Sequence, residues 1–198
     1  MKQGRPAVTT REELELVALQ LFAERGFDST TVDDVAEAAG IGRRTFFRYF
    51  ASKNDVVWGD WESALAYFQV QLAAIPYDVP LLEGLREAVK AFNALPEGAE
   101  QQHRVRMAMV LHTPALQAHS TLRYAGWRGV VAEHVAARTE LEPGDFRCQL
   151  LAHQVLACCV AAYEQWLSDP EADLQGLLDE AVSTLTGIVH LGHEKFVT

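Results

Sequence analysis

The sequence predicts an all-α protein in which an N-terminal helix-turn-helix domain of three helices precedes a larger helical domain. Apolar residues recur at spacings of three and four along the chain, as they do on one face of an α-helix. Prolines and glycines separate these periodic stretches, and no stretch alternates apolar and polar residues between turn pairs as a β-hairpin does. We expect the first domain to span residues 1–56 and the second domain to span residues 57–198.

The first two helices have recognisable boundaries in the sequence. An apolar stripe over residues 14–22 marks the first helix, and Gly26 can end that helix in a left-handed conformation. Thr31 and Asp34 have the spacing of a capping box, which opens the second helix. Gly40 ends this short helix, because glycine is poorly suited to a helix interior.

The remaining helices follow from the same kinds of signal. A third helix covers about residues 43–50, and Ser52 with Asp55 opens a fourth helix that could continue to Ala74. Beyond it, prolines stand where first turns or helix stops are expected. These signals predict five more helices, over residues 81–95, 100–112, 114–139, 143–168 and 171–191.

Charge is distributed unevenly along the chain. The protein has 17 Lys and Arg against 27 Asp and Glu, a net charge of −10, which by itself argues against a nucleic-acid partner. Residues 38–54, however, contain four cations and no acid. A short element with this local positive charge can face phosphates while the acidic remainder of the surface points away.

The segment between the second and third helices has the features of a helix-turn-helix. Small Ala36 and Ala39 let the two helices cross closely, and the glycines in Gly40–Gly42 permit a tight turn. Phe46 and Phe50 are four residues apart and therefore share the inner face of the third helix. The arginines of that helix then lie on its outer side.

This outer side is suited to double-stranded DNA. Guanidinium groups near the start of a recognition helix can donate two hydrogen bonds to a guanine edge, and hydroxyls suit phosphate oxygens. An arginine-bearing face is often merely solvated, but the coincidence of capping box, close crossing, glycine turn and aromatic core favours DNA binding. The residues that we expect to contact DNA are Thr31, Arg43, Arg44, Thr45, Phe47, Arg48, Tyr49 and Lys53.

These motifs resemble the N-terminal domain of the TetR (tetracycline-repressor) family. The resemblance rests on LFAERGFDSTTV (21–32), on residues 40–50 and on SKND (52–55). Longer runs resemble the actinobacterial TetR-type regulators associated with mycofactocin biosynthesis clusters: GRRTFFRYF (42–50), NDVVWGD (54–60), TPALQAHSTLRYAGWR (113–128) and AAYEQWL (161–167). In the wider family the position of Phe47 is often tyrosine and that of Tyr49 often histidine, so a base contact of Phe47 should be apolar, for example with a thymine methyl.

The resemblance implies a homodimer of about nine helices per chain, whose C-terminal domain holds a small-molecule effector and whose last two long helices pair across the two-fold axis. The residues support this independently, because helix 143–168 has two apolar faces and the last helix has one. Both faces could instead fill a monomeric core. The residues that we expect at the dimer interface are Leu150, Ala157, Ala161, Leu178, Leu185 and Ile188.

Aromatic and other apolar residues in the middle of the chain can line an effector pocket, although each taken singly is explained as well by the core. The candidate lining residues are Trp61, Leu65, Phe68, Met107, Leu111, Tyr124, Trp127, Val131, Tyr163 and Trp166. The resemblance implies a hydrophobic effector such as a long-chain acyl-CoA. Its head group would need cations at the pocket mouth, for which Arg104, Arg106, Arg123 and Arg128 are the candidates.

We expect an effector that fits only a state with a displaced fourth helix to spread the two recognition helices and release DNA. Repression relieved by the ligand is the default, while activation and corepression stay open. A helical enzyme that binds a small molecule and a protein-interaction adaptor are the alternatives. The enzyme rests only on the pocket, since no catalytic motif is present, and the adaptor leaves the cationic third helix unexplained.

The sequence predicts no metal and no other cofactor, since His190 and His193 lack a third ligand at a useful spacing. No apolar run is long enough to span a membrane, and the N-terminus carries no secretory signal, so we expect a cytoplasmic protein without a membrane partner.

Overall fold

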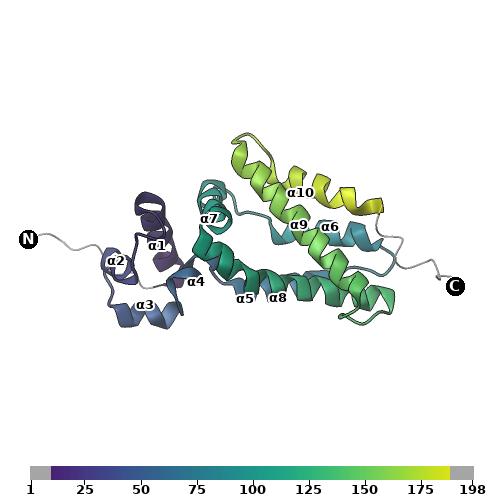
Figure 1. Cartoon of the computed structure of the whole chain (residues 1–198), viewed down its shortest axis with the longest axis horizontal. Helices are drawn as coiled ribbons and strands as arrows, with labels where there is room; N and C mark the ends of the chain where they lie inside the picture. The colour runs from purple at the N-terminus through teal and green to yellow at the C-terminus, as the bar shows by residue number, and fades with distance from the viewer. Residues whose placement is uncertain (1–9, 188–198) are drawn as a thin grey trace, which may run out of the picture. The chain divides into compact units, whose positions relative to one another are not determined.

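A computed structural model of the protein describes residues 10–187, and all regular secondary structure in this part of the chain is helical, as the sequence predicts. It contains ten α-helices and a final turn of 3-10 helix (Figure 1). The helices are α1 (Arg11–Arg25), α2 (Val32–Ala38), α3 (Arg43–Tyr49), α4 (Lys53–Trp58), α5 (Trp61–Ala73), α6 (Leu81–Phe92), α7 (Glu100–His112), α8 (Pro114–Thr139), α9 (Phe146–Ser168) and α10 (Leu174–Ser183), followed by the 3-10 turn η1 (Thr184–Gly187).

The described residues form two compact units. The first unit is built on residues 10–60 and 98–120, which hold α1 to α4, α7 and the first turns of α8. The second unit is built on residues 61–97 and 121–187, which hold α5, α6, the rest of α8, α9 and α10. The sequence places the domain boundary at residues 56/57 and assigns the whole of α7 to the second domain. The structure adds α7 to the first unit because Val110 is buried in the same core as α1, with Met107 and Met109 packed against it.

The helix starts and stops of the first unit follow the sequence signals closely. Thr31 and Asp34 form the expected capping box at the start of α2, and Thr10 forms another with Glu13 at the start of α1. Gly26 follows α1 with a φ of 84°, a backbone conformation that disfavours side chains. These local signals are strong because each involves residues at most four positions apart.

The fourth helix is an exception, because the continuous helix that the sequence allows from Ser52 to Ala74 is not formed. The helix is interrupted at Gly59, which has a φ of 58° and separates α4 from α5. Two backbone carbonyls at the break accept hydrogen bonds from arginines instead of from the next turn of a helix. Arg106 Nη1 donates to Val57 O at 3.0 Å, and Arg11 Nη2 donates to Gly59 O at 2.9 Å.

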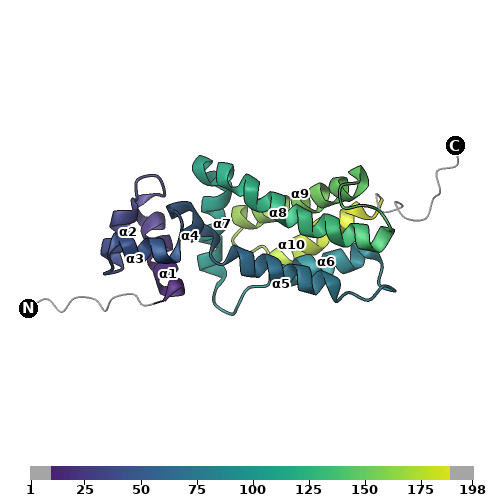
Figure 2. The same ribbon diagram turned by 90° about the horizontal axis from the view of Figure 1, so that it is seen from below.

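The second unit contains the long helix α9 and most of the long helix α8. In both views α5 lies alongside α8 (Figures 1 and 2), and Gln69 on α5 donates a hydrogen bond to Glu133 on α8. The helix expected over residues 81–95 ends at Phe92, after which the Asn93 side chain donates to Val89 O at 2.8 Å. The helix expected over residues 171–191 begins later, at Leu174, and its predicted end lies outside the described residues.

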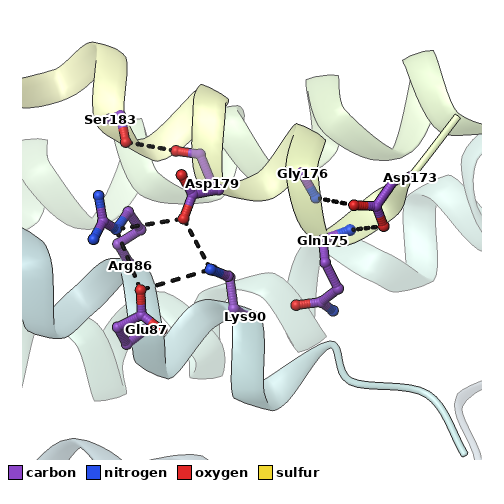
Figure 3. Close-up of polar contacts among 8 residues, drawn as sticks. All are labelled: Arg86, Glu87, Lys90, Asp173, Gln175, Gly176, Asp179 and Ser183. Carbon is purple, nitrogen blue, oxygen red and sulfur yellow. Dashed lines mark hydrogen bonds and ion pairs between the residues drawn. The ribbon is translucent and has the colours of Figure 1, made fainter.

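The last helix is fixed to α6 by charged side chains (Figure 3). Lys90 Nζ on α6 lies 2.9 Å from Asp179 Oδ1 on α10, and Arg86 Nε lies 3.5 Å from the same oxygen. The hydrogen bond from Lys90 is the main cause that lowers the pKa of Asp179. At the start of α10, Asp173 accepts hydrogen bonds from the backbone of Gln175 and Gly176. The apolar side of α10, with Leu178 and Val182, is buried in the core of the unit.

Replacing Gly59 by alanine should destabilise the protein. The left-handed φ of 58° is unfavourable for alanine, and an added Cβ would lie 3.1 Å from Arg106 Nη1 and from Glu15 Oε2. We expect a loss of about 1–3 kcal/mol in the free energy of unfolding, measured by urea denaturation. The control is Gly129→Ala in α8, where a Cβ meets no atom within 4 Å, and helix propensity should add up to about 1 kcal/mol. Equal effects of the two substitutions would contradict this account of the break.

The stability of the second unit should fall as the solution becomes acidic. His134 on α8 is buried, and burial, followed by the nearby Arg138, lowers the pKa of its imidazole to about 4. Because an unfolded histidine binds its proton at about pH 6.5, the unfolded state gains protons first as the pH falls from 6.5 towards 4, and folding is weakened over that window. At pH 5 the expected cost is on the order of 2 kcal/mol. Urea denaturation at several pH values checks this, because His134→Leu should flatten the dependence, and an unchanged dependence would contradict it.

Candidate functional site

The helix α3 is held against the first unit by its aromatic inner face. Phe46 and Phe50 are 0% and 2% exposed, and their ring centroids lie 5.9 Å apart. The tight turn before α3 is closed by a 2.9 Å hydrogen bond from Ile41 N to Ala36 O. Because the inner face is fixed in this way, the opposite face of α3 must point outward, as the sequence predicts.

The outward face gathers most of the residues expected to contact DNA. Arg44, Thr45, Phe47 and Arg48 together line an open hollow of about 500 Å³ on the surface of the first unit. Phe47 is 44% exposed although it is a large apolar residue, and its ring packs edge-on against Phe46. The surface therefore offers guanidinium groups, a hydroxyl and an apolar ring side by side, which are the groups that read base edges and a thymine methyl.

The three arginines of α3 are held differently. Arg43 Nη1 donates to Asp33 Oδ2 on α2 at 2.8 Å, and its guanidinium lies 5.3 Å from the centroid of the Phe47 ring. Arg48 donates to the Tyr49 hydroxyl at 3.1 Å and lies over the same ring. Arg44 makes no ion pair or hydrogen bond within the described part of the chain. All three side chains are thus exposed, but only Arg44 extends without a partner that restricts it.

Two of the expected contact residues are already engaged inside the protein. The Thr31 hydroxyl accepts from Asp34 N at 3.1 Å and donates to Asp34 Oδ2 at 2.5 Å. This hydroxyl bond, followed by the bond from Thr31 N to the same oxygen, lowers the pKa of the Asp34 carboxyl. Lys53 Nζ donates to Phe27 O at 2.7 Å and to Thr30 O at 2.9 Å. Its partial burial lowers the pKa of the ammonium group. The structure therefore gives Lys53 a role in holding the turn between α1 and α2, a long-range contact that the sequence does not reveal.

Arg11 is a further residue of this site that sequence reasoning missed. Its Nη1 donates to Tyr49 O, the last residue of α3, at 3.2 Å, and its guanidinium lies 4.6 Å from the Phe50 ring centroid. Together with its bond to Gly59 O, this side chain ties the end of α3 to the break after α4. No spacing in the sequence indicates this, because the partners are backbone atoms 38 and 48 residues away.

The candidate effector residues divide between the two units. Phe68 and Trp127 are buried in the second unit and stack with centroids 5.2 Å apart and planes at 13°, and both rings contact Phe92. Trp61 contacts Phe92 edge-on. Met107 and Leu111 lie instead on α7, in the first unit, where Met107 packs against that unit's core. The aromatic rings of the second unit are thus packed directly against one another.

The other candidates of the second unit are buried or half-buried. Val131, Tyr163 and Trp166 are buried, while Leu65 and Tyr124 are half-buried. The Tyr163 hydroxyl donates to Asn93 Oδ1 at 2.8 Å, which gives the apolar region a polar anchor. Burial raises the pKa of Tyr163 and raises the pKa of Tyr124 to about 12.

Three of the four arginines suggested for an effector head group are already paired. Arg106 forms an ion pair with Glu15 within the first unit. Arg104 pairs with Glu100 at 3.0 Å and Arg123 with Glu62 at 2.7 Å. These carboxylates compete with any phosphate group for the same guanidinium groups.

Comparisons with known proteins agree with this architecture. Residues 16–57 match the family model described as bacterial regulatory proteins of the tetR family, and residues 79–190 match the one described as the MftR C-terminal domain. Over 178 residues the chain is 45% identical to a Mycobacterium tuberculosis protein named as the mycofactocin biosynthesis transcriptional regulator MftR, with 90% of each chain covered. The chain belongs to the TetR family of bacterial transcriptional regulators. This membership sets aside the enzyme and adaptor alternatives.

Solved TetR-family structures share the fold of this regulator. FadR from Thermus thermophilus, solved in complex with lauroyl-CoA, gives a TM-score of 0.60 at 21% identity, with 96% of this chain and 99% of that chain covered. FadR from Bacillus subtilis, solved in complex with stearoyl-CoA, gives a TM-score of 0.63 at 15% identity, with 91% and 100% covered. At these identities the similarity concerns the fold.

The residues expected at a dimer interface of this TetR-family regulator do not share one surface. Leu178 and Leu185 are buried inside the single chain, so they are not available to a partner. Ala157 and Ala161 are exposed on α9, Leu150 is half-buried on the same helix, and Ile188 lies outside the described residues. The apolar stripe of α10 was expected to face a second subunit, but it faces α9 and α6, with which α10 makes extensive contacts.

Two other classes of site find no support in the described residues. No group of three or more His, Cys, Asp or Glu side chains is placed to hold a metal ion there, and His190 and His193 lie outside this part of the chain. Among the same residues, every helix is either too short or too polar to cross a lipid bilayer.

Proposed function

We propose that this regulator represses transcription in the cytoplasm by binding a palindromic DNA operator as a homodimer, and that a hydrophobic effector releases it. One observation carries the proposal: α3 presents Arg43, Arg44 and Arg48 on a surface fixed from behind by buried Phe46 and Phe50. In an otherwise acidic protein, such a concentration of exposed guanidinium groups is suited to bind the phosphate backbone of DNA.

The division of labour on α3 follows from the contacts. Arg44 extends without an intramolecular partner among the described residues and is suited to donate two hydrogen bonds to a guanine. Phe47, exposed beside it, offers a thymine methyl an apolar surface. Thr45 lines the hollow and Tyr49 is half-buried beside Arg48, and the hydroxyls of both can donate to phosphate oxygens.

The dimer surface that we propose is the outer face of α9. Ala157 and Ala161 are exposed there, four residues apart, and such small side chains let two helices approach closely. Leu150 lies about two turns earlier on the same helix and can extend the contact. A two-fold axis on this face would present two copies of α3, which a palindromic operator requires at a separation of about 34–36 Å.

For the effector we propose a long-chain acyl group, such as that of an acyl-CoA. The second unit offers a mainly aromatic and aliphatic interior, and Tyr163 and Asn93 form a polar pair within it. The FadR proteins that share this fold were solved with lauroyl-CoA and stearoyl-CoA, which supports the same class of ligand here. Because Phe68, Phe92 and Trp127 contact one another, an acyl chain must separate these rings to enter.

Such a ligand would act by shifting a population of conformations. Helix α8 has Leu116 in the core of the first unit and Trp127 in the second unit, and it is a single helix throughout. Moving Trp127 therefore strains the first turns of α8, which pack with α1 and α4 in that core. A hundredfold weaker operator binding requires that the ligand prefer the displaced state by about 2.7 kcal/mol.

Replacing Arg44 by alanine should weaken operator binding. We expect a loss of about 10- to 100-fold, because a bidentate arginine–guanine contact is worth about 1–3 kcal/mol. The measurement is fluorescence anisotropy with a duplex enriched from a random library by the wild-type protein, at several salt concentrations. Arg128→Ala, which removes an equal charge from α8 in the second unit, serves as the control. Equal affinities of the two variants for the duplex would contradict the assignment of α3.

A long-chain acyl-CoA should release the DNA complex. We expect palmitoyl-CoA to lower the affinity for the enriched duplex and to change the tryptophan fluorescence, because Trp61 and Trp127 belong to the ring cluster that must open. Coenzyme A without the acyl chain should do neither. Val131→Phe adds volume beside the cluster and should weaken the response to the ligand while DNA binding without ligand persists. Palmitoyl-CoA that leaves both fluorescence and DNA affinity unchanged would exclude this effector class.

A further inference from the structure

An ion pair at the edge of the DNA-facing surface is left unexplained by the proposed function. Arg43 Nη1 lies 2.8 Å from Asp33 Oδ2, and the two side chains are 58% and 67% exposed. The guanidinium also lies 5.3 Å from the centroid of the Phe47 ring, so Arg43 is held between α2 and its own helix. An acid in this place is unexpected, because phosphates approach the same surface.

The pair contributes little to the stability of the fold. Ion pairs between exposed side chains are worth about 0–1 kcal/mol, since solvent screens them and two long side chains must be ordered. Phe46 and Phe50 already fix α3, so the pair is not needed to seat the helix. Its effect should instead be sought on the DNA that the surface meets.

The carboxylate has two physical consequences for Arg43. It uses one of the two donors on Nη1 and leaves those on Nε and Nη2, so the guanidinium keeps the capacity to contact a base edge in one orientation. It also opposes a phosphate near Arg43, because an anion within about 8–10 Å of the DNA backbone is repelled at ordinary ionic strength. A contact between Arg43 and a phosphate would have to break the pair or bring Asp33 against the DNA.

We propose that Asp33 is a specificity-determining residue, which holds Arg43 towards a base edge and away from phosphates. It thereby weakens binding to non-specific DNA more than binding to the operator. This inference depends on the proposed DNA binding through α3. Non-specific complexes gain most of their affinity from cations that neutralise phosphates. An arginine that is kept away from the DNA backbone therefore lowers the affinity for non-specific DNA more than the affinity for the operator.

The test compares charge-neutral and charge-retaining variants of Asp33. Affinities for the duplex enriched by the wild-type protein and for a shuffled duplex of equal length are measured by anisotropy over a range of salt concentrations. Asp33→Asn should bind the shuffled duplex about 5- to 10-fold more tightly, with a salt slope steeper by about one unit for the released cation. Binding to the enriched duplex should change at most about twofold, so that discrimination falls by a similar factor. Asp33→Glu keeps a carboxylate within reach of Arg43 and should behave like the wild type.

Glu37 provides a matched control on the same helix. It is exposed, lies one turn after Asp33 on α2 and forms no ion pair within the described residues. Glu37→Gln removes the same charge and should change the two affinities alike. In a protein that also carries Arg43→Ala, Asp33→Asn should have no larger effect than Glu37→Gln, because its action passes through that arginine.

The possible results separate the inference from the function on which it rests. If Asp33→Asn and Glu37→Gln have equal effects, or if the effect of Asp33→Asn persists without Arg43, the inference is overturned. If the wild-type protein enriches no duplex at all, DNA recognition itself fails. Asp33→Ser, which also suits the first turn of a helix, gives a second neutral variant, and circular dichroism confirms that each variant is helical.

Discussion

Phe46 and Phe50 pack together in the core of the first unit, and their burial decides which side of α3 meets the solvent. Burying a phenylalanine side chain contributes about 1.5–3 kcal/mol, far more than any of the exposed ion pairs on the same helix. The position of the arginines is therefore a consequence of the apolar core. An acidic protein can present one cationic face because the seven-residue α3 is oriented by its aromatic side.

Around the buried Phe46 and Phe50, cationic side chains bind backbone carbonyls at helix ends and in a turn. Arg11 binds the carbonyls of Tyr49 and Gly59, and Arg106 binds the carbonyl of Val57. Lys53 does the same for the turn between α1 and α2. Carbonyls at helix ends have no partner within the helix, and a cation there is doubly favourable because of the helix dipole. These hydrogen bonds thus connect α1, α3, α4 and α7 within the first unit.

Local signals in the sequence were sufficient for much of this fold, and long-range contacts account for the rest. Capping boxes and the close crossing of α2 and α3 involve residues a few positions apart, so their sequence pattern carries the information. The break at Gly59 could not be predicted in the same way, because a single glycine is tolerated inside a helix and the arginines that stabilise the break come from α1 and α7. The apolar stripe of α10 shows another limit: periodicity identifies a buried face, but Leu178 and Leu185 are covered by the same chain and not by a second one.

The claim that α3 enters the DNA groove can be tested most directly by placing a cleavage reagent beside it. Ala51 is exposed and follows α3 by two residues, so an iron–EDTA group attached to Ala51→Cys should lie next to the bound duplex. The account predicts strand cuts within each half-site of the enriched duplex. No cuts are expected from the same label on Tyr67→Cys, an exposed position of α5 in the second unit. Cleavage from position 67 with none from position 51 would contradict the account.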